Sequence, residues 1–378
     1  ARYDNETQTI SITMTGAIED DLSSVFTVKG KDGDVAITDV TEGDAFNYTL
    51  KVAEPMELTM SYNVIYEGNE YKIVMPNIYS TESFENEYTY TGSDLGATWT
   101  KDKTTFKLWA PTAKSVALNL YKSGTEGTDD LIKTVDMTAD EKGTWVAKVD
   151  GDLNKTYYTY TVEVKGEKVE VCDPYARTTG VNGKRAMVID LASTNPEGWA
   201  NDKDPNASNK ITDDVIYEAH VRDLTLESGT TNVGKFIGVG ETGTTTEKGN
   251  KTGLDHIKDL GITHVQVLPF YDFGSVEETK EGGYNWGYDP VNYNVPEGSY
   301  STDPYNGDVR VEEAKQMVQA FHNEGIGVIM DVVYNHMYSA QNSCLDNTVP
   351  DYYFRKDGDK YTKPLENAEF VFYKGEGT

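Results

Sequence analysis

The sequence predicts a multidomain protein in which two immunoglobulin-like β-sandwich domains precede an incomplete α/β barrel of the TIM type. Three observations indicate this fold class. Apolar and polar residues alternate in short runs through residues 1–200, helical periodicity is nearly absent there, and longer apolar runs separated by helical patterns follow. The 378 residues are enough for two or three domains with cores of their own.

The first part of the chain has the period-two pattern of strands that bury one face. Clear alternation occurs in four ranges, which are 10–14, 58–64, 106–110 and 116–120. Turn signals such as Glu67-Gly68-Asn69 separate these runs at intervals typical of β-sandwiches. We interpret the polar stretch 80–86 as a join between two units. The pattern therefore predicts an N-terminal β-domain over 1–86 and a second β-sandwich over 87–175.

The pattern changes after Asp173-Pro174, where a loop-rich connector is predicted over residues 176–210. Beyond it, three apolar runs alternate with two helical patterns, at 215–223, 253–260, 263–273, 308–325 and 326–333. Nearly continuous apolar strands that alternate with helices indicate parallel pairing with both faces covered. Residues 211–378 are therefore predicted to form either an open doubly wound sheet or the first part of a (β/α)8 barrel.

The composition excludes several classes of partner. The 34 Lys and Arg residues face 63 Asp and Glu residues, which gives a formal net charge of −29. That charge repels phosphate backbones and anionic lipid headgroups, so no nucleic acid is expected, and a neutral polysaccharide fits. No apolar run reaches the roughly 18 residues of a membrane span, so no membrane insertion is expected. Low cysteine content and strong acidity favour an extracellular or cell-surface location in a bacterium. The sequence does not decide whether Cys172 and Cys344 form a disulfide bond.

Polar residues at the end of the third apolar run are candidate site residues. The segment Asp331-Val332-Val333-Tyr334-Asn335-His336 ends a buried strand with a carboxylate, an amide and an imidazole. In a barrel, the C-terminal strand ends build the active site. Such groups are costly to bury unless they meet each other, a ligand or an ion. Equally, the strand can simply end in solvent.

A second candidate is the aromatic segment Tyr284-Asn285-Trp286-Gly287-Tyr288-Asp289-Pro290. Three rings interrupted by Gly and followed by Asp-Pro predict a loop of fixed geometry. Flat rings beside a carboxylate suit a sugar, because pyranose C–H faces stack on aromatic rings. The same rings can equally anchor the loop to its core.

Several motifs in order resemble type I pullulanases, the debranching members of the α-amylase superfamily, over residues 95–356. YNWGYDP at 284–290 is similar to the signature segment of that group, and DVVYNH at 331–336 to the first region shared by α-amylase-type barrels. Upstream of both lie further similar segments: LGATW (95–99), FKLWAPTA (106–113), VCDPYA (171–176), VNGKRAMVID (181–190), VIYEAHVRDLT (215–225) and HVQVLPFYDF (264–273). The first two resemble a starch-linked β-sandwich, and residues 1–86 resemble an additional, candidate carbohydrate-binding β-domain.

The resemblance implies roles for matching positions only. Tyr288 would stack on the sugar ring at the cleavage subsite, and Asp289 and Tyr284 belong to the same substrate-binding loop. His336 would bond hydroxyls of that sugar, with Asp331 holding the surrounding loops. Asn335 matches a position that can bind calcium in related amylases, so the resemblance leaves a structural calcium ion as an alternative. It implies no required cofactor. His220 and His264 remain unassigned.

The implied reaction is the retaining hydrolysis of α-1,6 branch linkages in pullulan, amylopectin and related α-glucans. Such a mechanism needs two carboxyl groups about 5 to 5.5 Å apart. The family carries them on its fourth and fifth barrel strands, and no segment of this chain matches those. The chain from Val215 onward is also shorter than the roughly 250 residues of a complete barrel. We therefore expect part of a larger enzyme, inactive alone, whose residues 362–378 do not match the family.

Three alternatives remain at this stage. A neopullulanase or α-amylase would cleave α-1,4 bonds. A non-catalytic starch-binding protein would use aromatic rings such as Trp99, Trp109 and Trp145, although Trp109 interrupts an alternating strand and is predicted to be core. A metallohydrolase would gather its ligands from the predicted strand ends, namely His220, His264, His336 and Asp331, without the paired spacing typical of a metal site.

Overall fold

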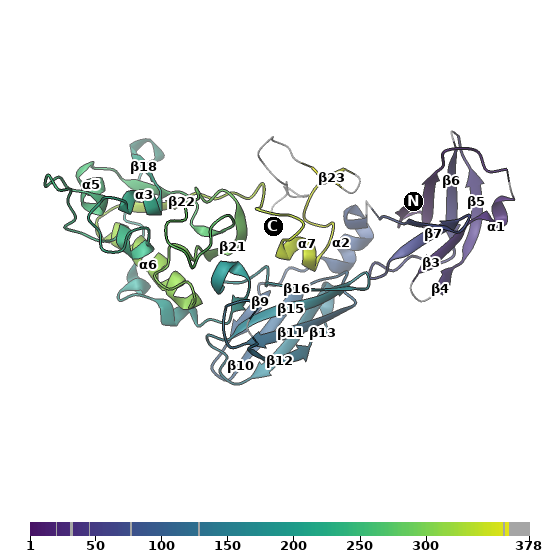
Figure 1. Ribbon diagram of the computed structural model, residues 1–378, viewed down its shortest axis with the longest axis horizontal. Coiled ribbons are helices and arrows are strands. Elements are labelled where there is room, and N and C mark those ends of the chain that lie inside the picture. The colour runs from purple at the N-terminus through teal and green to yellow at the C-terminus, as the bar shows by residue number, and fades with distance from the viewer. Residues whose placement is uncertain are drawn as a thin grey trace.

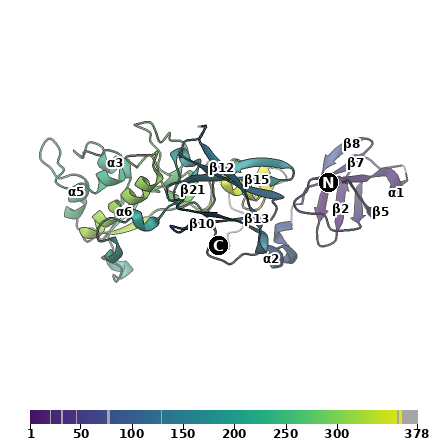
Figure 2. The same cartoon turned by 90° about the horizontal axis from the view of Figure 1, so that it is seen from below.

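The computed structural model describes residues 1–362 except 20, 31–32, 45, 76–77, 128 and 358–359. Three units follow one another along the long axis of the molecule, with the N-terminal β-sheets at one end and the helix-containing unit at the other (Figure 1). The perpendicular view in Figure 2 shows the same order. Two β-sandwiches followed by a parallel α/β unit confirm the predicted fold class.

The N-terminal unit is a sandwich of two four-stranded antiparallel sheets. Its elements are β1 (Arg2–Asp4), β2 (Thr9–Thr13), α1 (Leu22–Val25), β3 (Thr27–Gly30), β4 (Gly33–Val35), β5 (Ile37–Glu42), β6 (Asn47–Val52), β7 (Tyr62–Tyr66) and β8 (Asn69–Lys72). The sheet orders are β1-β2-β6-β5 and β4-β3-β7-β8. Alternate residues such as Ile10, Leu50, Val28 and Val64 fill the core between them. The expected strand 58–64 begins only at Tyr62.

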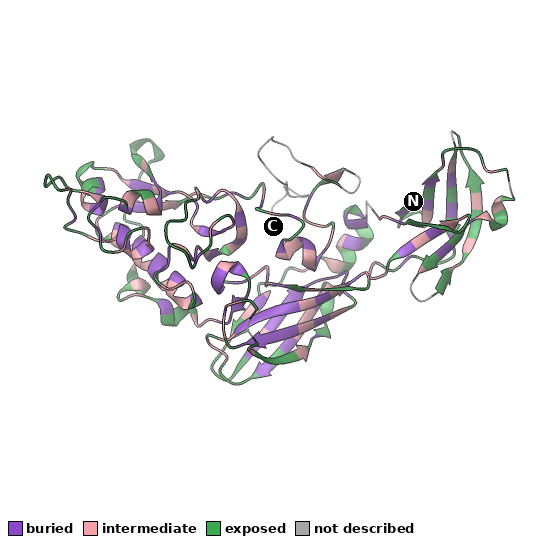
Figure 3. Cartoon of the chain, in the orientation of Figure 1, coloured by how far each residue is buried: buried purple, intermediate pink, exposed green. Residues whose placement is uncertain are grey.

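Several strands of the second sandwich are buried over most of their length (Figure 3). Its strands are β9 (Gly96–Trp99), β10 (Lys103–Trp109), β11 (Ser115–Tyr121), β12 (Leu131–Asp136), β13 (Thr138–Ala139), β14 (Thr144–Asp150), β15 (Tyr157–Val164), β16 (Glu167–Val171) and β17 (Ala186–Met187). One sheet runs β13-β14-β10-β9 and the other β12-β11-β15-β16, with β17 paired to β15. Phe106, Leu108, Leu118 and Tyr160 interdigitate in the core.

The predicted join contains helices that the sequence analysis did not expect, η1 (Ile78–Ser80) and α2 (Glu82–Tyr88). Thr81 begins α2 by accepting a hydrogen bond from the Phe84 N–H, as an N-cap residue does. The buried ring of Phe84 then packs with Trp109 of the second sandwich and Tyr352 of the third unit. The join therefore contacts all three units, and Trp109 is a core residue, as predicted.

The third unit is built on three parallel strands in the order β18-β19-β22. Its elements are β18 (Ile216–Ala219), α3 (Val221–Thr225), α4 (Phe236–Val239), α5 (Gly253–Asp259), β19 (His264–Val267), β20 (Tyr271–Phe273), β21 (Pro290–Pro296), α6 (Gly307–Asn323), β22 (Gly327–Met330), α7 (Cys344–Thr348), β23 (Lys356–Asp357) and β24 (Lys360–Tyr361). The single-turn helices η2 to η6 cover Glu141–Gly143, Val181–Gly183, Leu191–Thr194, Trp199–Asn201 and Ile211–Asp213. Phe236, Leu254 and Phe321 pack around the parallel sheet.

The three expected parallel strands are all shorter than predicted, and β22 (Gly327–Met330) covers only part of the run 326–333. The run 215–223 leaves the sheet after Ala219, because His220 becomes the N-cap of α3. The run 263–273 breaks at Leu268-Pro269, and its second part, β20, instead forms an antiparallel pair with β21. Proline lacks the N–H that a continuing parallel ladder needs.

Three further expectations concern the cysteines, a membrane-spanning helix and the C-terminal segment. Cys172 and Cys344 are free thiols. Within the described residues, no helix combines the length and apolar character needed to cross a membrane. The final segment 363–378, which includes most of the stretch predicted not to match the family, lies outside the described residues.

Candidate functional site

The two candidate segments leave neighbouring parts of the third unit. The aromatic segment 284–290 connects β20 to β21, and the polar segment 331–336 follows β22 directly. The aromatic segment has no regular secondary structure before Pro290, as its glycine and Asp-Pro predicted. Each segment therefore projects from a strand end and can meet the other beyond the sheet.

The aromatic segment is held by hydrogen bonds within itself and to the preceding loop. Asp289 accepts from Asn285 Nδ2 (2.7 Å) through Oδ1 and from Ser275 Oγ (2.7 Å) through Oδ2. Asn285 Oδ1 in turn accepts the Gly287 N–H (2.8 Å). Gly287 has a φ of 89°, and a Cβ there would collide with the Pro269 carbonyl. The loop geometry is therefore fixed, and Asp289 is one of its internal anchors.

Tyr288 and His336 bring the two segments together. The Tyr288 hydroxyl donates to Asp331 Oδ2 (2.6 Å), and His336 Nε2 lies 2.6 Å from the Tyr288 carbonyl oxygen. Because a carbonyl only accepts, the ring carries a proton on Nε2. Burial and then the Asp331 carboxylate raise the pKa of Tyr288, so its phenol stays neutral and remains a donor.

Two further tyrosines hold the polar segment in place. Tyr271 Oη accepts the Val333 N–H (3.1 Å), and Tyr293 Oη donates to the His336 carbonyl (2.9 Å). Both tyrosines belong to the β20–β21 hairpin. The sequence analysis named neither of them as a site residue.

His220 anchors the start of the aromatic segment, a role that the sequence analysis left open. The Asp223 N–H donates to His220 Nδ1 (3.3 Å), so a neutral ring carries its proton on Nε2, 2.8 Å from the Asn285 carbonyl. Tyr284 lies beside this imidazole and donates to Asp223 Oδ2 (3.2 Å). The exposed ring of Trp286 follows, with 61% of its surface accessible.

The residues required by a metallohydrolase are not gathered. His264 begins β19 at the amino end of the parallel sheet, opposite to the end that carries His220 and Asp331. In the described part of the chain, the only three acidic or imidazole groups close enough to share an ion are Asp272, Glu278 and Glu297, and Arg310 already pairs with Glu278. The side chain of Asn335 is exposed and is not part of that group.

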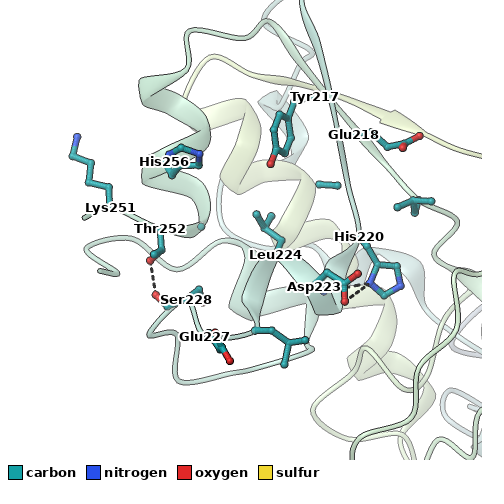
Figure 4. Close-up of a pocket in the computed structure, with 14 residues that line it drawn as sticks. Tyr217, Glu218, His220, Asp223, Leu224, Glu227, Ser228, Lys251, Thr252 and His256 are labelled. Atoms are coloured by element: carbon teal, nitrogen blue, oxygen red, sulfur yellow. Dashed lines mark hydrogen bonds and ion pairs between the residues drawn. The ribbon is translucent and has the colours of Figure 1, made fainter. Parts of the chain in front are cut away.

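A pocket of about 490 Å³ lies beside His220, which is one of its lining residues (Figure 4). Residues of β18, α3 and α5 line it, including Glu218, Asp223 and His256. Figure 4 shows the His220 ring beside Asp223 at its edge, and Thr252 bonded to Ser228 across it. Tyr288, Asp289 and His336 do not line this pocket. Its polar walls therefore belong to a second surface next to the aromatic segment.

The tryptophans of the second sandwich pack against buried side chains, Trp109 in the cluster around Phe84 and Trp145 on the sandwich core. Trp109 is buried and its Nε1 donates to the Tyr88 carbonyl (2.9 Å), while Trp145 Nε1 donates to the Ala110 carbonyl (3.1 Å). Trp99 packs partly against the same core. A starch-binding surface made from these three rings has no support in this arrangement.

Comparison with known proteins matches two regions of the chain. Residues 94–176 match the family described as carbohydrate-binding module 48 (isoamylase N-terminal domain), and residues 235–375 match the α-amylase catalytic domain. The expectation that residues 362–378 do not match the family is therefore wrong for 362–375. A pullulanase from Bacillus subtilis is 39% identical over 293 residues, which is 77% of this chain and 39% of that protein. The chain belongs to the type I pullulanase family. It spans about two fifths of that curated relative.

Solved pullulanase structures have the same fold. The structure from Anoxybacillus sp. LM18-11 superposes with a TM-score of 0.82 at 38% identity, over 98% of this chain and 53% of that one. The pullulanase of Paenibacillus barengoltzii in complex with maltohexaose and α-cyclodextrin gives a TM-score of 0.74 at 46% identity, over 78% of this chain and 46% of that one. The parallel strands β18, β19 and β22 therefore correspond to part of a pullulanase barrel.

Proposed function

We propose that this chain takes part in the retaining hydrolysis of α-1,6-glucosidic branch linkages in pullulan, amylopectin and related α-glucans, and that it supplies glucan-binding residues. The observation that carries this proposal is the contact between the two family segments, in which Tyr288 bonds both Asp331 and His336. Relatives crystallised with maltotetraose, maltotriose and maltohexaose support an α-glucan as the ligand. The net charge of −29 suits a neutral polymer.

Each site residue has a proposed part in holding one glucose unit. The Tyr288 ring stacks on the sugar face, and Asp331 sets the orientation of that ring through its hydrogen bond. The His336 imidazole bonds sugar hydroxyls. Asp289 and Tyr284 shape the rest of the binding loop, and Asn335 is the position proposed for a structural calcium ion.

We further propose the division of labour along the chain. Residues 1–86 form an accessory β-domain, 87–175 the starch-linked sandwich, 176–210 the connector and 211–378 the first part of the catalytic barrel. The nucleophile and acid/base carboxyl groups of the family lie on strands that have no counterpart in the matched motifs, so the chain alone is expected to bind glucan without cleaving it. An extracellular or cell-surface location in a bacterium fits a polymeric substrate.

The test measures binding and hydrolysis separately. Titration of the chain with maltotetraose should give saturable heat, while incubation with pullulan should release no reducing ends. Tyr288→Ala should weaken maltotetraose binding about fivefold or more, because it removes a stacking ring. Tyr305→Ala is the matched control, since that tyrosine is 53% exposed and lies on another loop of the same unit. Equal affinity of the two variants would reject the role of Tyr288.

A further inference from the structure

Four charged side chains that the proposed glucan site does not use lie buried where the connector meets the third unit. They are Asp272 of β20, Glu278 and Glu297 in the loops after β20 and β21, and Arg310 of α6. Arg310 and Glu297 are fully buried. One oxygen from each carboxylate lies within 4.8 Å of the other two. We call these four residues the junction cluster.

Arg310 and Glu278 hold the connector backbone. The guanidinium forms a bidentate pair with Glu278, at 3.1 and 2.8 Å, and also donates to the Gly180 carbonyl (3.2 Å). Glu278 Oε2 accepts the Asn182 N–H (2.7 Å). The connector then passes directly over Asp272 at Gly183, where a Cβ would collide with Asp272 Oδ2. The junction cluster is thus the surface on which the connector sits.

The single guanidinium does not balance three carboxylates. Arg310 donates both of its hydrogen bonds to carboxylate oxygens to Glu278. The nearest oxygen of Asp272, Oδ1, lies 4.0 Å from Arg310 Nη1. Asp272 Oδ2 accepts from Asn292 Nδ2 (2.6 Å), and Glu297 accepts the N–H groups of Phe273 and Ser299, so both meet only neutral donors. Fully ionised, the cluster would hold a net charge of −2 away from water, which is strongly unfavourable.

The charged and titratable groups around the cluster do not supply the missing charge. Lys235, the N-cap residue of α4, donates to the Ser299 carbonyl (2.9 Å) and forms no ion pair with the cluster. Burial lowers its pKa, against the attraction of nearby carboxylates that include Glu297 and Glu278. Glu313 of α6 accepts from Thr302. The remaining neighbours are acidic or neutral: Glu277, Glu281, Tyr300, Cys172 and Cys344. Within the described residues, Arg310 is the only basic group that forms an ion pair with any of the three carboxylates.

We propose that Asp272 and Glu297 bind protons to hold the connector on the barrel, so that this junction loosens as the pH rises. Burial, and then the neighbouring Glu278, raises the pKa of Asp272 and brings the pKa of Glu297 to about 7. A carboxyl whose pKa is higher in the folded state stabilises that state at low pH. The contribution is lost as the pH rises through the folded-state pKa. The mutual repulsion of the ionised pair then acts directly beneath the connector.

Tryptic cleavage of the full 378-residue chain after Arg185, identified by the masses of the fragments, measures the opening of this junction. Arg185 is buried and pairs with Asp130, so cleavage there requires the connector to detach. Asp272→Asn mimics the protonated state, because its amide oxygen can still accept from Asn292. The initial rate of wild-type cleavage, divided by the rate of this variant at the same pH, cancels the pH dependence of trypsin.

We expect this ratio to be near one at about pH 6 and to reach about tenfold at about pH 8.5. Glu297→Gln should behave like Asp272→Asn and serves if the latter folds poorly. Glu277→Gln is the matched control, since it removes the same charge from an exposed carboxylate that also bonds Asn182, and should keep the wild-type pH dependence. A ratio that is equal at both pH values would overturn the proposal. The proposal would also be overturned if millimolar calcium lowered the wild-type cleavage rate at about pH 8.5 to that of the variant. A metal ion, and not protons, would then balance the charge of the cluster.

Discussion

The second sandwich and the third unit differ in how the apolar faces of their strands are covered. In the sandwich, two antiparallel sheets close over one core, and the inward side chains of β10, β11 and β15 are almost fully buried. In the third unit, the outer strands β18 and β22 carry exposed apolar side chains, with Ile216 at 53% and Met330 at 38% accessibility. Parallel strands need cover on both faces, whereas an antiparallel sandwich covers itself. The described residues thus contain one self-sufficient module and one that presents unpaired strand edges.

The largest predicted difference is in the cost of removing an apolar side chain from each unit. Phe106→Ala empties a site with no solvent exposure in the sandwich core and should lower the free energy of unfolding by about 3 to 5 kcal/mol. Ile216→Ala removes a half-exposed side chain from β18 and should cost less than about 1 kcal/mol. Urea titration followed by tryptophan fluorescence measures both. Similar losses would show that β18 is covered in solution, and would remove the contrast between the units.

A buried carboxyl gives the sandwich its own pH dependence. Asp173 Oδ2 accepts from the hydroxyls of Tyr158 (2.7 Å) and Tyr160 (3.2 Å), and burial raises its pKa from 3.8 to about 6. The folded state therefore keeps a proton that the unfolded state releases. The contribution of Asp173 to sandwich stability is greatest below its unfolded-state pKa and falls by about 3 kcal/mol as the pH rises through 6.

Asp173→Asn should abolish this fall. The difference in unfolding free energy between the variant and the wild type should shift by about 3 kcal/mol in favour of the variant between about pH 3 and pH 7.5. Asp150→Asn removes an exposed carboxylate at the end of β14 and should leave the wild-type dependence in place. A constant difference for Asp173→Asn would mean that Asp173 is ionised in the folded state throughout.

The same contrast explains which elements could be predicted from the sequence. Period-two alternation marks strands with one buried face, so β10 and β11 were located to within a few residues. In the third unit, a continuous apolar run does not show where a strand leaves the sheet, and His220 and Pro269 ended two runs early. Helix α2 was missed because its buried contacts come from distant segments, including Tyr352.

The site could be predicted in part for a similar reason. Short motifs indicated Tyr288, Asp289, Asp331 and His336, and their contacts follow from the motif order along neighbouring strand ends. The anchoring role of His220 could not be predicted, because it depends on a contact 65 residues away with a backbone carbonyl that has no sequence signature. The junction cluster was missed because its members only become neighbours in the folded hairpin and helix.

The smallest predicted effect is that of the Tyr288 hydroxyl. Tyr288→Phe keeps the ring and removes the donor to Asp331, so it should lower the stability of the third unit by about 1 kcal/mol and leave the sandwich transition unchanged. Maltotetraose affinity should fall less than in Tyr288→Ala, because the stacking surface remains. Tyr305→Phe, on an exposed ring, controls for the loss of a hydroxyl alone. If Tyr288→Phe weakens binding as much as Tyr288→Ala, the hydrogen bond that orients the ring, and not the ring's surface, dominates recognition at this site.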